Sequence, residues 1–172
     1  MSEKIVNFIV GLFGSVTTMP FIKEIIVFII SMCPILELRG GLIAASLLNM
    51  NPWISYLICM IGNILPIPFI LWLINKILNK MRNSKNKKIN GIAKWLDKNV
   101  EKRKGQIEKY GYRGLVLFVG IPLPGTGAWT GCLIASVLEM DKKKSFLAAL
   151  FGVFMASIIM MLISFGLLSN II

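Results

Sequence analysis

Glu37 and Arg39 are opposite charges inside an apolar stretch of this 172-residue chain, and they are its strongest candidates for chemistry. Arginine stays charged in proteins, and its planar guanidinium forks onto phosphate or carboxylate oxygens. Burial favours the neutral form of a carboxyl group, whereas a nearby cation favours its ionised form. A carboxyl group under both influences can load and release a proton. A lone charge at membrane depth costs ~2.5–3.5 kcal/mol, so the pair predicts either a site for an anion and a proton or a structural ion pair.

A second group of candidate residues surrounds a turn rich in proline and glycine near residue 125. Its glycines and threonines offer bare backbone and hydroxyl groups, and a helix beginning after Gly127 would present its N-terminal amides to an anion. Close packing between helices is the alternative role for the glycines. The complete candidate binding set is Glu37, Arg39, Gly40, Asn63, Arg113, Pro124, Gly125, Thr126, Gly127, Trp129 and Thr130.

Asn63, Trp129 and Arg113 each have two interpretations. Asn63 either lines a cavity or bonds a neighbouring helix, and Trp129 either forms a wall of the site or packs as an apolar side chain. Arg113 either anchors the chain at the lipid headgroups or guides a lipid phosphate. Histidine is absent, and the sequence has no cluster of acids for a metal and no nucleophile beside a base. We therefore expect no metal, no cofactor and no enzyme activity.

An internal repeat supplies the elements that position these residues, because residues 34–62 match residues 124–152 at an offset of 90. Each copy is a proline-broken apolar stretch, and paired interrupted segments in the two halves of a chain point to the binding site of a transporter. The copies differ at the charges, where copy two has Gly127 and Trp129. The identical pairs are Pro34/Pro124, Gly41/Gly131, Ala45/Ala135, Ser46/Ser136, Leu48/Leu138, Met50/Met140, Ser55/Ser145, Leu57/Leu147 and Gly62/Gly152.

The composition indicates an integral membrane protein. The chain is 56% hydrophobic with a mean hydropathy of +0.75, which soluble domains rarely reach. Residues 53–74 and 145–168 are each long enough to cross the ~30 Å bilayer core, which takes ~20 residues. Residues 5–22 are weakened by glycines and threonines, and they either cross the membrane or lie tilted at its interface.

The net charge of +11 is concentrated between Lys76 and Arg113, where thirteen Lys and Arg face three acids. A nucleic-acid site is one interpretation of such a cluster, but between membrane segments the positive-inside rule favours a cytoplasmic loop. Its apolar residues recur at helical spacing and lysines fill the other positions. This pattern predicts an amphipathic helix on the cytoplasmic leaflet, with its lysines facing anionic lipid headgroups and no nucleic-acid partner.

A second lysine cluster, residues 141–144, decides whether the stretch before it crosses the membrane or returns. If 113–138 enters and comes back, both lysine-rich regions are cytoplasmic, as the positive-inside rule favours. Residues 121–127 hold two prolines and two glycines, which cannot continue a helix. We therefore expect 113–138 to be a re-entrant hairpin. By the repeat, 25–49 is its partner and enters from the outer face, where residues 49–52 carry no charge.

The expected fold is an all-α integral membrane protein with two inverted repeats linked by a basic amphipathic helix. Each repeat is a re-entrant helical hairpin plus a transmembrane helix. Residues 1–172 form a single membrane domain, with an N-terminal helix at 1–23, repeat 1 at 24–75, the cytoplasmic helix at 76–112 and repeat 2 at 113–172. We expect self-association, because one small chain has few helices to enclose a hydrated path.

Two motifs resemble those of the bacterial and archaeal small multi-drug export protein family. They are Glu37-Leu38-Arg39-Gly40-Gly41 and Pro122-Leu123-Pro124-Gly125-Thr126-Gly127-Ala128-Trp129-Thr130-Gly131, and the resemblance covers roughly residues 25–170. That family is in turn similar to the DedA/VTT membrane proteins, which have two opposed re-entrant hairpins. The resemblance implies a multi-pass protein of a prokaryotic plasma membrane.

Resemblance to DedA proteins implies proton-coupled flipping of a phosphate-bearing lipid, such as a polyprenyl phosphate or a phospholipid. DedA proteins place an acid in the first hairpin, a role that Glu37 would fill. They also place two arginines around the proline of the second hairpin, where this chain has Ile121 and Gly127, so Arg39 would supply the positive charge from the other hairpin. Two alternatives stay open: export of small drug-like molecules, which the family name implies, and a structural membrane scaffold.

Overall fold

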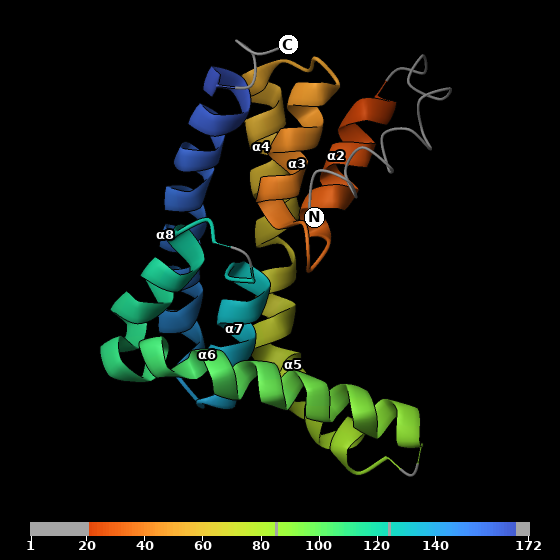
Figure 1. Ribbon diagram of the computed structural model, residues 1–172, viewed down its shortest axis with the longest axis vertical. Coiled ribbons are helices and arrows are strands. Elements are labelled where there is room, and N and C mark those ends of the chain that lie inside the picture. Colours follow the sequence, from red (N-terminus) through yellow and green to blue (C-terminus); the bar gives the residue numbers. More distant parts are fainter. Residues whose placement is uncertain (1–20, 85, 124, 168–172) are drawn as a thin grey trace. The chain divides into compact units, whose positions relative to one another are not determined.

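The computed structural model describes residues 21–84, 86–123 and 125–167, and every regular element in these ranges is a helix (Figure 1). The predicted all-α class is therefore confirmed for the described residues. Residues 5–20 of the N-terminal segment and Pro124 lie outside them. The helices are α2 (Ile22–Met32), α3 (Glu37–Leu47), α4 (Pro52–Ile64), α5 (Pro66–Arg82), α6 (Lys87–Gly120), α7 (Ala128–Val137), α8 (Lys142–Met161) and the π-helix η1 (Leu162–Leu167).

Within the described residues, two helical stretches are long and apolar enough to cross a membrane. The first runs through α4 and α5, Pro52–Arg82, and the second through α8 into η1, Lys142–Gly166. They contain 31 and 25 residues, which exceeds the ~20 residues that a bilayer core requires. Both are candidate membrane-spanning helices, and each begins close to the position predicted from the sequence.

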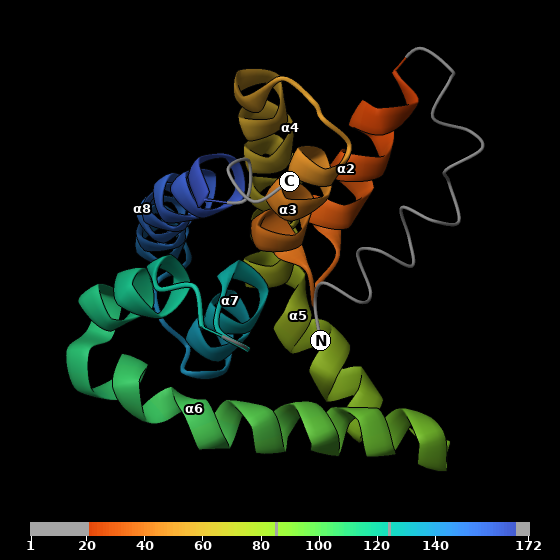
Figure 2. The same ribbon diagram turned by 45° about the horizontal axis from the view of Figure 1, so that its top comes forward.

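The chain forms two compact units, and the boundary between them divides both spans. Unit 1 contains the described part of Met1–Leu65 together with the chain from Val153 onward, and unit 2 is Pro66–Gly152. In unit 1, α2, α3 and α4 all pack against one another, as both ribbon views show (Figures 1 and 2). Fully buried apolar side chains such as Val27, Leu38 and Leu42 form the core of this unit.

In unit 2, α5, α6 and α7 pack against one another around buried residues such as Ile67 and Ile134. The basic segment predicted at 76–112 consists of the end of α5, which ends at Arg82, and most of α6, which begins at Lys87. The side chain of Asn86 caps α6 by accepting a hydrogen bond of 3.0 Å from the N–H of Lys88. A second break falls within α6 at Gly111, whose φ of 58° and ψ of −132° are not helical.

The two copies of the repeat end and restart their helices in the same way. Asn49 and Glu139 follow α3 and α7 with left-handed φ angles of 51° and 54°. Two residues later, Asn51 and Asp141 cap the next helices. Asn51 accepts backbone hydrogen bonds of 3.0 and 3.3 Å through Oδ1, and Asp141 accepts one of 2.9 Å. Positions separated by 90 residues are therefore equivalent in local structure as well as in sequence.

Equivalent glycines also make equivalent helix contacts in each unit. A Cβ on Gly62 of α4 would lie 2.9 Å from the carbonyl oxygen of Phe28, and a Cβ on Gly152 of α8 would lie 2.9 Å from that of Val116. Neither position has room for a larger side chain without movement of the backbone. In each repeat, α4 or α8 therefore packs closely at its glycine against the helix that opens the repeat.

The second helix of each repeat is also bonded to the end of the other repeat's span. In unit 1 the hydroxyl of Ser46 on α3 donates a 2.6 Å hydrogen bond to the carbonyl oxygen of Ser164 in η1. In unit 2 the side-chain amide of Asn75 on α5 donates a 2.7 Å bond to the carbonyl oxygen of Ser136 on α7. Ser46 and Ser136 are equivalent residues, so each unit combines helices from both repeats.

Candidate functional site

Glu37 is the first residue of α3, and it is a buried carboxylate in a strained backbone conformation. Only 5% of its surface is exposed, and its φ is 51°, a left-handed value that residues with a Cβ rarely adopt. The equivalent residue in the second copy is Gly127, which precedes α7 with a φ of 141°. A glycine adopts positive φ without steric cost, whereas a non-glycine residue in the left-handed region costs ~1–2 kcal/mol.

Arg39 and Gly40 lie in the same first turn of α3. Arg39 is half-buried, and it lies two residues after Glu37 in the chain. Gly40 is buried, and a Cβ there would lie 2.7 Å from Cβ of Leu36, so this glycine keeps the turn before α3 tight. The predicted pair of opposite charges therefore sits where the chain enters α3.

Asn63 lies near the end of α4 and at the level of Glu37. A Cβ on Gly41 would lie 2.8 Å from Sγ of Cys59, which fixes the register of the antiparallel helices α3 and α4. One turn back along α3 from Gly41 is Glu37, and one turn forward along α4 from Cys59 is Asn63. Asn63 is 3% exposed, and its Oδ1 accepts no hydrogen bond from any described residue. A buried acceptor of this kind calls for a donor.

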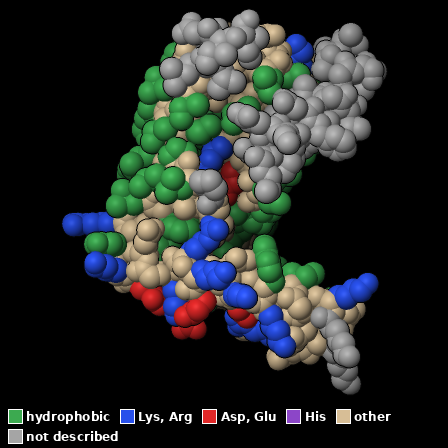
Figure 3. Space-filling model, viewed as in Figure 1, with side chains coloured by type: hydrophobic (Ala, Val, Ile, Leu, Met, Phe, Trp, Pro, Cys, Tyr) green, Lys and Arg blue, Asp and Glu red, His purple; other side chains and the backbone are tan. Residues whose placement is uncertain are grey.

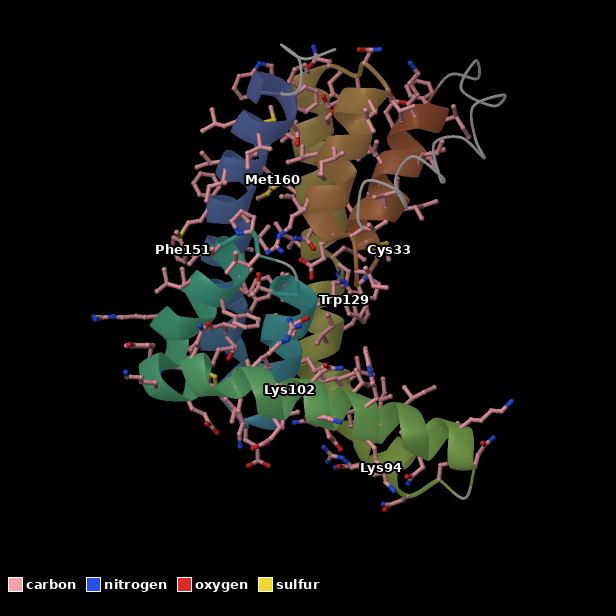
Figure 4. All side chains as sticks on the ribbon, in the orientation of Figure 1. Cys33, Lys94, Lys102, Trp129, Phe151 and Met160 are labelled. Atoms are coloured by element: carbon pink, nitrogen blue, oxygen red, sulfur yellow. The ribbon has the colours of Figure 1, made fainter. Side chains whose placement is uncertain are left out.

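The second group of candidate residues lies in the turn before α7 and in its first turn. Thr126 donates hydrogen bonds of 2.9 and 2.8 Å from Oγ1 to the carbonyl oxygens of Ile121 and Leu123, so its hydroxyl holds the turn closed. Gly125 has a φ of 79° and is exposed. Trp129 and Thr130 are half-buried, and Figure 4 labels Trp129 near the start of α7. Pro124, which belongs to this turn, is outside the described residues.

The predicted site residues thus fall into two clusters, one in each unit. Glu37, Arg39, Gly40 and Asn63 belong to unit 1, whereas the residues of the α7 turn belong to unit 2. Arg113 is in unit 2 as well, but it is exposed next to the break at Gly111, at the opposite end of segment 112–120 from the turn. Arg113 is therefore not part of the cluster at the α7 turn.

Arg103 is a site residue that sequence reasoning missed. Its guanidinium lies directly over Gly125, where an added Cβ would overlap Nη1, Nη2 and Cζ of the arginine. The sequence shows Arg103 as one basic residue among many. A signal was nonetheless present, because Arg103 follows Val100 by three residues and precedes Ile107 by four, and side chains at these spacings share a helix face.

Among the described residues, no group of three His, Cys, Asp or Glu side chains could hold a metal ion. All three cysteines are free, with Cys59 and Cys132 buried and Cys33 half-exposed. The clusters therefore offer charge, hydrogen-bond acceptors and bare backbone. In proteins generally, groups of these kinds can bind anions and protons.

Comparison with known proteins identifies the family. A family model described as "Putative small multi-drug export protein" matches residues 37–159, from the first residue of α3 almost to the end of α8. No curated protein and no solved structure matches the chain. The matched range contains both candidate clusters and both repeats' second helices, and the apolar helices agree with a membrane protein of a transport family. The chain belongs to the small multi-drug export protein family.

Proposed function

We propose that this protein is a proton-coupled transporter that flips a phosphate-bearing lipid, a polyprenyl phosphate or a phospholipid, across the prokaryotic plasma membrane. The observation that carries the proposal is Glu37, a buried carboxylate held at a φ of 51° where the equivalent residue is glycine. Backbone strain of this kind clusters at functional sites, where the surrounding structure holds a residue in a conformation it would otherwise leave.

Glu37 is the proton carrier in this proposal. Its protonated form is a hydrogen-bond donor, and Asn63 Oδ1, at the same level of the helix pair, is the buried acceptor that lacks a partner among the described residues. Its ionised form is instead stabilised by Arg39. The carboxyl group therefore has a favourable environment in each protonation state, which a group that loads and releases a proton requires.

Arg39 is the substrate-binding cation of the same cluster. Its planar guanidinium matches the oxygens of a phosphate group, and its partial burial strengthens the electrostatic attraction to that group. When Glu37 is protonated, Arg39 loses its negative neighbour and its affinity for an anion rises. Proton loading and anion binding are thereby favoured together, which is a coupling mechanism that needs only these two side chains.

The two inverted repeats provide the architecture for transport. In the proposal, two hairpins are re-entrant and enter from opposite faces, with Asn51 outside and Lys143 in the cytoplasm. One is formed by α2 and α3, and the other by α7 and the part of α6 that follows the break at Gly111. Equivalent helix caps and equivalent glycine contacts in the two copies support a repeat. A hairpin that ends inside the membrane exposes its charged side chains and its glycine backbone at that depth. Such groups are stable there only beside protein or a hydrated path.

Anionic lipid is the proposed partner of the surface helix α6, over which Lys and Arg side chains gather (Figure 3). The acids of α6 form ion pairs: Asp97 pairs with Arg82 of α5, and Glu101 and Glu108 pair with Lys104 of the same helix. Ile92 and Trp95 are 52% and 64% exposed and suit the boundary between headgroups and acyl chains. The exposed lysines on this helix are Lys88, Lys94, Lys98, Lys102 and Lys109.

Export of small drug-like molecules is the second candidate, and membership of the small multi-drug export family favours it. The two functions differ at Arg39, because a cationic drug would be repelled by a guanidinium that attracts phosphate. A substrate comparison in one preparation therefore separates them.

The test uses purified full-length protein reconstituted into liposomes. Flipping of fluorescent polyprenyl phosphate and phospholipid is measured beside uptake of a cationic dye, each with and without a pH gradient. The proposal predicts gradient-dependent lipid flipping that falls strongly in Arg39→Ala and falls less in Arg39→Lys, which keeps the charge but loses the planar fork. Dye transport without lipid flipping would favour the export function instead.

A further inference from the structure

We propose that Arg103, on the surface helix α6, binds the phosphate group of a ligand at the turn before α7. The inference rests on the proposed function for the class of substrate, but it rests on different residues, all of them in unit 2. It adds a second phosphate-binding cation to the one assigned to Arg39, and it gives α6 a role beyond contact with the membrane surface.

Close contact with Gly125 is the first observation. A Cβ at Gly125 would overlap both terminal nitrogens of Arg103 and would lie 2.6 Å from Cζ, so the guanidinium rests on bare backbone. The φ of Gly125 is 79°, which a residue with a Cβ rarely adopts. Steric space and backbone conformation both require glycine here. The result is a cation delivered to the surface of a glycine turn.

The position of Arg103 on its helix is the second observation. It lies on the packed side of α6, between Val100 and Ile107, which are 2% and 0% exposed. Its neighbour Lys102 is exposed, as are Lys98 and Lys109. A lysine or arginine with only a surface role would be expected on that exposed side. Arg103 instead points its charge from α6 toward the turn that opens α7.

The lack of a protein partner is the third observation. The acids nearest to Arg103 along α6, Glu101 and Glu108, form ion pairs of 2.8 and 3.4 Å with Lys104. Among the described residues, none forms a hydrogen bond or ion pair with Arg103. A half-buried guanidinium carries five N–H donors in a fixed fork. Phosphate oxygens fit this fork in the bidentate arrangement that arginine favours.

Equilibrium binding tests the proposal on full-length protein in micelles of a maltoside detergent, which carries no phosphate group. Inorganic phosphate and phosphatidic acid are titrated separately, and the rise in unfolding temperature at each concentration gives a Kd. The variants are Arg103→Gln, Arg103→Lys and Gly125→Ala, and Lys102→Gln is the matched control that removes one charge from the exposed side. The unfolding temperature without ligand reports any purely structural effect.

We expect Arg103→Gln and Gly125→Ala to weaken binding about tenfold or more, as loss of a charge-assisted hydrogen bond predicts. Lys102→Gln should stay within roughly twofold of the wild type, because an exposed charge contributes little. If Arg103→Gln does not fold, Arg103→Lys keeps the charge without the fork and should still bind more weakly. Binding of phosphatidic acid alone identifies a lipid headgroup as the ligand, and binding of both probes identifies any phosphate group.

Three results would overturn the proposal: wild-type affinity in Arg103→Gln, an equal loss in Lys102→Gln, or no binding of either probe to the wild type. The measurement involves no transport. A wild type that binds phosphate through Arg103 and fails to flip lipid would therefore refute the proposed function and leave this site in place.

Discussion

Replacing Glu37 by glycine and by alanine separates a functional carboxylate from a structural one. Both changes remove the charge, but only glycine relieves the φ of 51°. Inside an ordinary helix alanine is more stable than glycine by ~1 kcal/mol. At Glu37 the order should reverse, because a Cβ in the left-handed conformation costs ~1–2 kcal/mol. The sign of the difference between the two variants is therefore the first prediction.

The magnitude relative to the wild type follows from the same terms. Glycine recovers ~1–2 kcal/mol of strain and loses ~0.5–1 kcal/mol to the greater entropy of the unfolded chain. Loss of the Coulombic attraction to Arg39 acts in the opposite direction, so a Glu37 that serves transport and not structure should leave Glu37→Gly within about 1 kcal/mol of the wild type. Glu37→Ala should be less stable than Glu37→Gly by about 1 kcal/mol. If the two charges were a structural buried pair, either change would cost ~3–5 kcal/mol.

Denaturant unfolding in mixed detergent micelles, followed by tryptophan fluorescence, measures these differences. The response of transport to a pH gradient, assayed on the same preparations, should be lost in both variants. Alanine as stable as glycine would refute the strain. A loss of several kcal/mol in both variants would assign Glu37 to structure rather than to transport.

Three further predictions concern the surroundings of Glu37 and the architecture. Asn63→Leu should leave the free energy of unfolding unchanged or raise it by up to ~1 kcal/mol, because it removes an unsatisfied buried acceptor, and it should slow transport. A marked loss of stability in the same unfolding assay would show that the amide is hydrogen-bonded. Gly62→Ala should lower the free energy of unfolding by ~1–3 kcal/mol, because the added methyl group overpacks against the neighbouring helix. Gly91→Ala, with nothing within 4 Å of the added Cβ, should leave stability unchanged or raise it, and equal effects of the two changes would contradict the close packing. Cysteines at Asn51 and Lys143 in intact cells should label from outside and inside respectively, and labelling from one side would remove the inverted repeat.

The elements of this fold were predictable where the signal is local. The length of the apolar stretches predicts the two candidate spans. The prolines at 34 and 122 predict the breaks between α2 and α3 and between α6 and α7. The offset of 90 was visible as identities such as Gly62 and Gly152, and these glycines proved to make equivalent contacts. The break in α6 at Gly111 lies next to the boundary expected between residues 112 and 113, but its non-helical conformation was not predictable, because a single glycine between helical residues is compatible with a continuous helix.

The site was predictable in its residues and not in its geometry. Glu37 stood out as a charge in an apolar run, but its left-handed conformation is visible only in the structure. The level of Asn63 follows from the register of two helices, which single-sequence patterns do not give. Arg103 could not be distinguished by sequence from the other basic residues of its cluster. Its proposed role depends on contact with Gly125, more than twenty residues away in the chain.

The most direct test of the central claim is lipid flipping by the Glu37→Gln variant in liposomes with an imposed pH gradient. Glutamine keeps the size of the side chain and cannot carry a proton. We expect wild-type flipping to accelerate with the gradient, whereas Glu37→Gln should still bind the lipid phosphate but flip at one rate with and without the gradient. Wild-type flipping in Glu37→Gln that still responds to the gradient would contradict the account.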